Sequence, residues 1–212
     1  MDRRQFVTGG LATIAAGLTN NARAAIQQLG PYAWRAYVAH PQLVQQQCAQ
    51  WCWAASTSMI FAHHNHAVAQ SRIVARVFGG GTPCLSSGYG PNGPTGTITG
   101  VLGATWQEDN NGSTFQPTIV AGYDAYYGIN QITNTFIIDE LRNDRPLLYC
   151  NTHHAMVVVS VGFFQTPMGP NVQEVGVLDP WPTSGGYHLL SPAEMVPSAI
   201  GGQMTYLAAV HI

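Results

Sequence analysis

The sequence predicts an α+β fold, with helices in the N-terminal half and an antiparallel sheet in the C-terminal half. Three runs have the length and apolar spacing of helices, and four later runs are rich in β-branched and aromatic residues. No helix-like run separates the strand-like runs, so βαβ units and a parallel sheet are not expected. The predicted helices are 52–63, 72–78 and 135–142, and the predicted strands are 147–150, 155–164, 174–179 and 204–210.

The three helices are predicted from their apolar content and from the residues at their ends. The first is mostly apolar, which is typical of a buried helix. Ser71 is the expected N-cap of the second, and the glycines at 79–81 end it. Thr133 or Asn134 is expected to cap the third, which ends before Pro146.

The strands follow the last helix and are separated by turn signals. A Pro-Met-Gly-Pro turn at 167–170 divides the second strand from the third. Gly, Pro, Thr, Ser and Asn dominate residues 79–122, where few apolar positions recur at a regular spacing. We therefore expect a long loop there, with short helical turns at most, that forms one rim of a cleft.

The first 24 residues have the features of a signal peptide of the twin-arginine type. Arg3 and Arg4 precede an apolar stretch at 9–18, and Ala22-Arg23-Ala24 has the pattern of a cleavage site. The apolar stretch is too short to span a bilayer, so no membrane span is expected in the mature form. The sequence therefore predicts a signal peptide at 1–24 and one domain at 25–212, in a bacterial protein of the periplasm or secreted from the cell.

The composition of residues 25–212 excludes several classes of function. They contain no lysine, and five arginines face nine carboxylates, for a net charge of −4 with neutral histidines. No run of basic residues is present, so binding to nucleic acid or to an anionic membrane surface is not expected. The absence of lysine excludes Schiff-base chemistry and a phosphate-binding loop of the Walker type.

Cys52 is the predicted nucleophile. It begins the first helix, where the macrodipole and the backbone N–H groups stabilise a thiolate. Gln46 lies one loop earlier and can direct its amide toward an oxyanion at the same place. His154 is the expected base, because a hairpin of the strands that follow it would set it beside Asp179, which would orient its imidazole.

Two other histidines are alternative candidates for the base. His153 is the neighbour of His154, and the alternation of a strand points the two side chains to opposite faces. His188 follows a Gly-Gly turn and is the second choice as base. Asp179 precedes Pro180, so it can also be a simple turn residue.

A group of histidines ends the first helix. His63 and His66 have the spacing of two metal ligands, but no third ligand with evident spacing is near them. Histidines such as His64 at the C-terminal end of a helix also bond its last carbonyl groups and complement its dipole. We favour this second interpretation and predict neither a metal site nor a cofactor.

The four cysteines allow three disulfide connectivities. A nucleophilic Cys52 must stay reduced, which leaves one bridge and one further thiol. We expect the bridge between Cys48 and Cys84, because it would join the loop before the nucleophile to the loop after the second helix. Cys150 lies in an apolar strand and is expected to be a small buried residue.

Three segments resemble the papain-like cysteine proteases. The run Gln46-Gln47-Cys48-Ala49-Gln50-Trp51-Cys52-Trp53 resembles their active-site segment, and residues 154–163 resemble their histidine strand. The run Val177-Leu178-Asp179-Pro180 resembles the Asp-Pro ending of the shorter bacterial branch, which includes bacteriocin-processing peptidases and effector proteases. The resemblance covers residues 43–182 except the middle stretch 79–133.

The resemblance implies a papain-like fold, in which a helical half carries Cys52 and a sheet half carries His154 and Asp179. It implies that these three residues are nucleophile, base and orienting group, and that Gln46 donates to the oxyanion. Cys48 matches a cysteine that is commonly disulfide-bonded in the superfamily. The sequence departs from papain in having Asp, not Asn, as third member, and in lacking Gly and Ser before the nucleophile.

We therefore expect an exported cysteine peptidase or amide hydrolase that acts on a peptide or protein. An acyl transferase or deamidase would use the same thioester chemistry, and the transferase would yield amine-linked products. A catalytically silent binding domain of the cell envelope is the third hypothesis. It would fold normally but would lack a reactive thiolate at Cys52.

Overall fold

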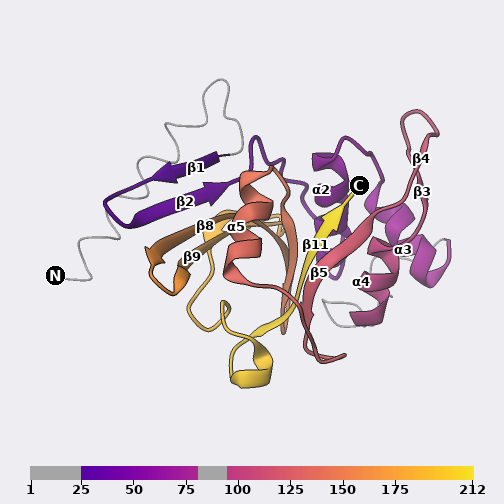
Figure 1. Cartoon of the computed structure of the whole chain (residues 1–212). Helices are drawn as coiled ribbons and strands as arrows, with labels where there is room; N and C mark the ends of the chain where they lie inside the picture. Colours follow the sequence, from indigo (N-terminus) through magenta and orange to yellow (C-terminus); the bar gives the residue numbers. More distant parts are fainter. Residues whose placement is uncertain (1–24, 81–94) are drawn as a thin grey trace.

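The computed structural model describes residues 25–80 and 95–212, and it has the predicted α+β architecture. Figure 1 shows α5 in front of the main sheet, with α2, α3 and α4 gathered to one side of it. The helices are α2 (Cys52–His63), α3 (Gln70–Phe78), α4 (Thr95–Leu102), α5 (Asn134–Arg142) and the 3-10 helix η1 (Ser198–Ile200). The strands are β1 (Ala25–Gln28), β2 (Ala33–Tyr37), β3 (Trp106–Gln107), β4 (Thr114–Phe115), β5 (Thr118–Asp124), β6 (Ile129–Asn130), β7 (Leu147–Asn151), β8 (Ala155–Thr166), β9 (Gly169–Asp179), β10 (Gly186–Leu189) and β11 (Met204–His211).

The main sheet is antiparallel and is organised around β8. Its order is β1-β2-β8-β7-β11-β5-β6, and β9 pairs with β8 and carries β10. β8 is long enough to pair with β7 near its start, with β2 further along, and with β9 over most of its length. Its residues from Ala155 to Phe163 are buried, which explains why this run is apolar without alternation.

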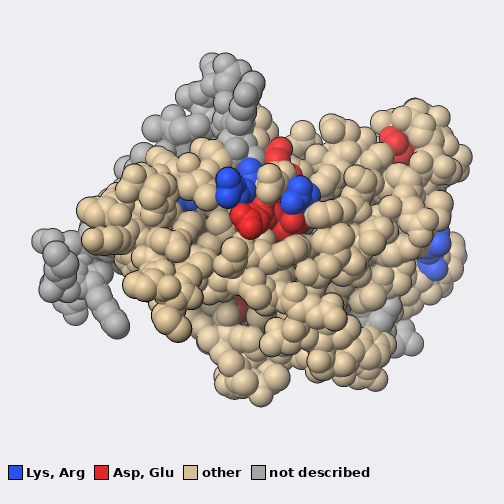
Figure 2. Space-filling view, in the orientation of Figure 1, with Lys and Arg blue, Asp and Glu red and all other residues tan. Residues whose placement is uncertain are grey.

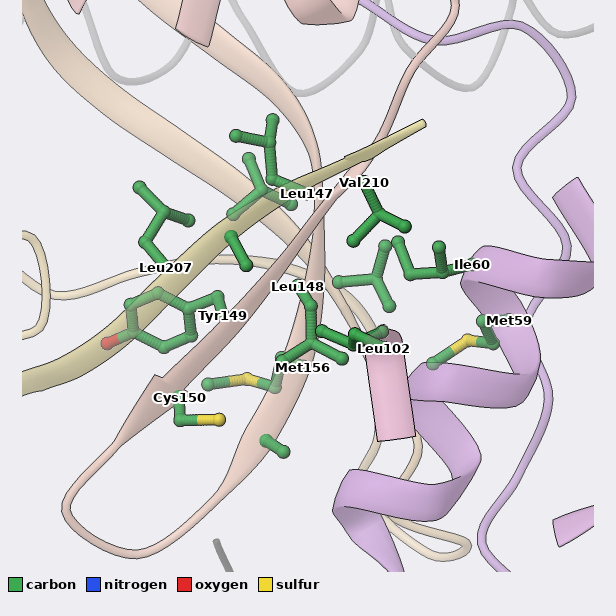
Figure 3. Packing of buried hydrophobic residues seen from close by; sticks show 14 of the residues in the cluster. Met59, Ile60, Leu102, Leu147, Leu148, Tyr149, Cys150, Met156, Leu207 and Val210 are labelled. Carbon is green, nitrogen blue, oxygen red and sulfur yellow. The ribbon is translucent and has the colours of Figure 1, made fainter. Parts of the chain in front are cut away.

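α2 is the central helix, and its burial explains its composition. Every residue from Cys52 to Phe61 is buried, because the helix packs against β7, β8 and α3. Figure 3 shows Met59 and Ile60 of this helix beside Leu102 of α4 and directed toward the strands. The first residue of α2 is therefore held in place by a continuous core.

The predicted ends of the helices are partly confirmed. Thr133 is the N-cap of α5, and its Oγ1 accepts a hydrogen bond from the Phe136 N–H over 3.2 Å. The prediction of Ser71 as the N-cap of α3 is wrong, because the N-cap is Ala69. The Ala69 N–H donates to Asp109 Oδ2 over 2.6 Å, so a distant carboxylate binds the backbone where the helix begins.

The prediction of a long loop at 79–122 is wrong for the part that the structure describes. Residues 81–94 lie outside the described residues, and α4, β3, β4 and β5 occupy most of the chain from 95 to 124. In α4 the buried residues Ile98, Val101 and Leu102 have helical spacing. The threonines and glycines around them have low helix propensity and obscure this pattern, so packing and not propensity stabilises the helix.

β5 lacks a clear strand signal in the sequence because of its glycine. The strand pairs with β11, and a Cβ atom at Gly122 would lie 2.9 Å from the backbone oxygen of Leu207. Glycine is therefore required here for close approach of two strands and does not mark a turn.

Charged residues are few, and on the face of the molecule seen in Figure 2 most of them form a single group. Figure 2 shows this group, of both signs, in the region of α5. α5 and the residues after it carry the ion pairs Arg145–Glu140 and Arg142–Asp139. Within the described ranges, none of the helices has the length and apolar character needed to cross a membrane.

Candidate active site

Cys52 is the first residue of α2, and its side chain lies inside the protein. Trp51 occupies the N-cap position, and Cys52 is 1 % exposed. The thiol is therefore located where the positive end of the helix dipole favours a negative charge. Its low exposure also shields that charge from most of the solvent.

His154 and Asp179 meet at one end of the β8–β9 pair. His154 directly precedes β8, Asp179 ends β9, and the strands pair so that Val157 faces Leu178. This register brings the two side chains together, and His154 Nε2 donates to Asp179 Oδ1 over 2.5 Å. The exposed fractions of the two side chains are 17 % and 14 %, so the bond is shielded from most solvent.

The side chain of His154 also forms a hydrogen bond with Cys52. Because Asp179 engages Nε2, Nδ1 is the ring nitrogen that remains for the thiol. Cys52, His154 and Asp179 therefore form a continuous series of contacts from α2 to β9. The structure thus brings together three predicted site residues that lie far apart in the sequence.

The contacts of His154 decide its charge. Burial lowers the pKa of His154, but the hydrogen bonds with Asp179 and Cys52 and their charges raise it to about 9. In Asp179, burial raises the pKa, while hydrogen bonds from His154 and from the Trp181 N–H bring it below its ordinary value. At neutral pH the pair is therefore an imidazolium bound to a carboxylate.

Gln46 is buried in the loop before α2. Its side-chain Nε2 donates to the carbonyl oxygens of Cys48 and Ala49, over 2.9 Å each. Its backbone N–H donates to the Pro180 carbonyl over 2.8 Å, which ties this loop to the end of β9 beside Asp179. The structure therefore places Gln46 in the same region as the other three residues, with its amide hydrogens turned toward its own loop.

Trp181 is part of the site, although the sequence did not single it out. Its ring lies edge-on to the His154 ring, with 6.0 Å between the centroids, and its backbone N–H donates to Asp179 Oδ1 over 2.8 Å. The ring thus packs beside the imidazole of His154. The signal was present as an aromatic residue directly after the Asp-Pro dipeptide.

The other candidate histidines do not form a hydrogen bond with Asp179. His153 is exposed, and its backbone N–H is bound by Asn151 Oδ1 over 2.8 Å. His188 lies on β10 opposite Val177. Its charge also lowers the pKa of Asp179, but by less than the hydrogen bonds from His154 and the Trp181 N–H and the charge of His154 do. The structure therefore distinguishes His154 from both alternatives by its contacts.

The cysteines fall into two groups. Cys48 is disulfide-bonded, whereas Cys52 and Cys150 carry thiols outside any disulfide. Cys84, the predicted partner of Cys48, lies outside the described residues. Cys150 is fully buried in β7 (Figure 3), and burial raises the pKa of its thiol well above the usual range.

At the end of α2, His63 and His66 bind groups outside the helix and not its last carbonyls, and the Nε2 of His64 is buried without a hydrogen-bond partner among the described atoms. His63 Nε2 donates to the Asp144 carbonyl over 2.8 Å, and His66 Nδ1 is 2.9 Å from Glu108 Oε1. Burial lowers the pKa of His64 to about 4, and the neighbouring histidines act in the same direction. Within residues 25–80 and 95–212, no group of three His, Cys, Asp or Glu side chains is arranged to hold a metal ion.

Comparison with known proteins assigns a family. The model described as the Peptidase_C39 like family matches residues 36–196, a range that contains Gln46, Cys52, His154 and Asp179. A search of the curated proteins finds no match. The match covers most of the chain and agrees with an α+β fold of helices followed by an antiparallel sheet. The chain therefore belongs to the Peptidase_C39-like family, a papain-like branch of the cysteine-type peptidases.

Proposed function

We propose that the chain is an exported cysteine peptidase or amide hydrolase with Cys52 as nucleophile, His154 as acid and base, and Asp179 as orienting carboxylate. One observation carries the proposal: the side chain of His154 forms hydrogen bonds with both Asp179 and Cys52. Membership of a peptidase family supports a peptide or protein as the substrate.

The proposed chemistry proceeds from these contacts. The Cys52 thiolate attacks the scissile carbonyl carbon, and the carbonyl π electrons move to its oxygen. The oxyanion collapses, the C–N bond breaks, and the His154 imidazolium gives its proton to the leaving amine. Neutral His154 then takes a proton from water, which attacks the thioester and releases the acid and the Cys52 thiolate. Asp179 stabilises the imidazolium and holds the ring in place throughout.

We further propose that Gln46 and the backbone N–H of Cys52 stabilise the oxyanion. In the structure Gln46 Nε2 already donates to two carbonyl oxygens, and its Oε1 is buried without a hydrogen-bond partner among the described atoms. The developing negative charge is a stronger acceptor than a peptide carbonyl, so one N–H of this amide turns to it. Such a donor is worth about 3 kcal/mol of the activation free energy.

Export belongs to the same proposal. Residues 1–24 direct the chain through a twin-arginine route, and residues 25–212 form the peptidase domain in the periplasm or outside the cell. A Cys48–Cys84 bridge suits an oxidising compartment of this kind.

Alkylation of thiols by iodoacetamide tests the catalytic proposal. The mature protein is labelled between about pH 4 and pH 9, and the modified cysteines are mapped by mass spectrometry. We expect rapid modification of Cys52 at about pH 5 and a decrease of about tenfold or more in His154→Ala, because the neighbouring imidazolium stabilises the reactive thiolate. Cys150 should react only after unfolding, since it is fully buried and burial raises the pKa of its thiol well above the usual range.

His153→Ala is the matched control. This exposed histidine is the neighbour of His154 in the chain, and its replacement should leave the rate at Cys52 unchanged. Equal effects of the two variants, or a Cys52 found in a disulfide, would contradict the proposal and favour a silent binding domain. Amine-linked products formed from a peptide and an added amine would instead identify an acyl transferase.

A further inference from the structure

We propose that Asn151 and Glu194 are positioning residues for His154. Asn151 holds the backbone at His154, and Glu194 holds the Asn151 amide in the one orientation that allows this. The inference rests on the proposed role of His154 and extends it to two residues outside the proposed catalytic triad.

Asn151 binds the peptide groups of His154 on both sides. Its side-chain Oδ1 accepts hydrogen bonds from the His153 N–H over 2.8 Å and from the His154 N–H over 2.7 Å. Its own backbone N–H donates to the His154 carbonyl over 2.9 Å. One residue, 7 % exposed, therefore sets the path of the tight turn that joins β7 to β8 and ends at the proposed base.

Glu194 determines which way the Asn151 amide faces. Asn151 Nδ2 donates to Glu194 Oε1 over 3.0 Å. Since the amide nitrogen must face this carboxylate, the amide oxygen must face the turn. A reversed amide would set its oxygen against the carboxylate and its nitrogen against two N–H donors, which is unfavourable at both ends.

Hydrogen bonds from Ser191 and Tyr149 fix the position of Glu194. Its Oε2 accepts from the Ser191 N–H over 2.9 Å and from Ser191 Oγ over 2.8 Å, and its carbonyl accepts from Tyr149 Oη over 2.9 Å. Burial raises the pKa of Glu194, but the bonds from Ser191 and Asn151 bring it below its ordinary value, so the carboxylate is ionised at neutral pH. The segment after β10 thereby controls the turn between β7 and β8.

The short His154–Asp179 bond explains why this control matters for catalysis. His154 must meet Asp179 at 2.5 Å and contact Cys52 at the same time, so a small backbone shift breaks one of the two contacts. Displacements of about 1 Å can reduce catalysis by about a hundredfold. A turn without Asn151 would keep the hairpin but release the histidine.

The donor and acceptor roles of this pair can be exchanged. In Asn151→Asp, two carboxylates face each other at neutral pH, and the turn should be lost. In the double variant Asn151→Asp with Glu194→Gln, the introduced glutamine can donate its amide to the aspartate and still accept from Ser191 through its oxygen. The aspartate then still accepts from the N–H groups of His153 and His154.

The experiment measures the rate of Cys52 alkylation by iodoacetamide at about pH 6, together with thermal unfolding. We expect Asn151→Ala and Asn151→Asp to react about tenfold or more slowly than the wild type, because His154 no longer contacts the thiolate. The double variant should recover most of the wild-type rate. A purely structural role would not predict recovery of the rate by an exchange of donor and acceptor.

Asn111→Ala is the control. Asn111 Oδ1 accepts from the Ser113 N–H over 2.7 Å, and its Nδ2 donates to Glu108 Oε2 over 3.1 Å. The same type of network therefore supports the β3–β4 hairpin, which Figure 1 shows away from β8 and β9. This variant should alkylate at the wild-type rate.

Each outcome decides the inference. A folded Asn151→Ala with the wild-type rate, or a folded double variant no faster than Asn151→Asp, would overturn it. Failure of both Asn151→Ala and the double variant to fold would also overturn it, since the pair would then act on folding. If His154→Ala alkylates like the wild type, the proposed function fails; if it is slow while Asn151→Ala is fast, only this inference fails.

Discussion

His154 is a side chain whose charge is decided by opposing effects. Burial by itself favours the neutral ring and lowers the pKa of His154, while its bonds with Asp179 and Cys52 favour the imidazolium and raise it to about 9. The two hydrogen bonds outweigh the effect of burial because both Asp179 and Cys52 carry or develop negative charge at short range. His154 therefore holds a proton at neutral pH, which is what a group that protonates a leaving amine requires.

Removal of the Asp179 charge should weaken the hold of His154 on this proton. Asp179→Asn should move the pKa of His154 from about 9 toward the ordinary value of 6.5, because the neutral amide no longer stabilises the imidazolium. Titration of the ring by NMR measures this directly. The His154 contribution to folding stability is fully present below about pH 6.5 in the wild type, and it is lost as the pH rises through about 9.

Asp144→Asn is a suitable control for this titration. Asp144 lies near His63 and not near His154, and its positive φ of 62° is a conformation that asparagine also adopts. The titration of His154 should not change in this variant. An unchanged titration in Asp179→Asn would show that Asp179 does not orient His154.

At the scale of elements, a buried carboxylate joins α5 to the last strand. Glu140 is 3 % exposed and accepts from Arg145 Nε over 3.0 Å and Arg145 Nη2 over 2.7 Å. His211 Nε2 of β11 lies 2.9 Å from Glu140 Oε2. The helix, the segment after it and the C-terminal strand therefore share one charged group, and loss of that group would leave Arg145, whose side chain is 31 % exposed, without its buried partner.

Glu140→Gln should lower the free energy of unfolding by about 3 kcal/mol, measured by urea denaturation at neutral pH. Burial raises the pKa of Glu140, but Arg145 and His211 bring it below 4.5. Its stabilising effect is therefore present above about pH 4.5 and is lost as the pH falls through the lower folded value. The variant should lack this part of the acid sensitivity.

The exposed neighbour Asp139 provides the comparison. Its pair with Arg142 spans 3.4 Å, and both side chains are about half exposed. Asp139→Asn should therefore change the stability by less than about 0.5 kcal/mol. If both variants had equally small effects, the buried network would contribute nothing net to the fold.

At the scale of the whole molecule, the proposed signal segment makes a separate prediction. Replacement of Arg3 and Arg4 together by lysine should abolish export, whereas Arg23→Lys should not, because it lies outside the twin-arginine pattern. The exported protein should begin at Ala25, which N-terminal sequencing determines. Export of the double variant, or a different first residue, would contradict the proposal.

The fold could be predicted from the sequence where local pattern and tertiary packing agree. The apolar run after His154 is a buried strand at the centre of the sheet, and the apolar run after Cys52 is a buried helix. They disagree at Gly122, where the local composition indicates a loop and the structure has a strand. They also disagree at Ala69, which is the N-cap of α3 although its side chain cannot cap a helix. In both cases a contact with a distant residue replaces the local signal.

The sequence by itself determined the class of the protein and the residue types of its proposed chemistry. A cysteine at the start of an apolar helix, an upstream glutamine and a later His and Asp are local features of the chain. Only the tertiary structure decided which ring nitrogen of His154 meets Asp179, that Trp181 packs beside His154, and that Asn151 holds the turn. These facts depend on strand register and side-chain direction, which arise when distant segments pack together and are therefore not encoded in any single segment.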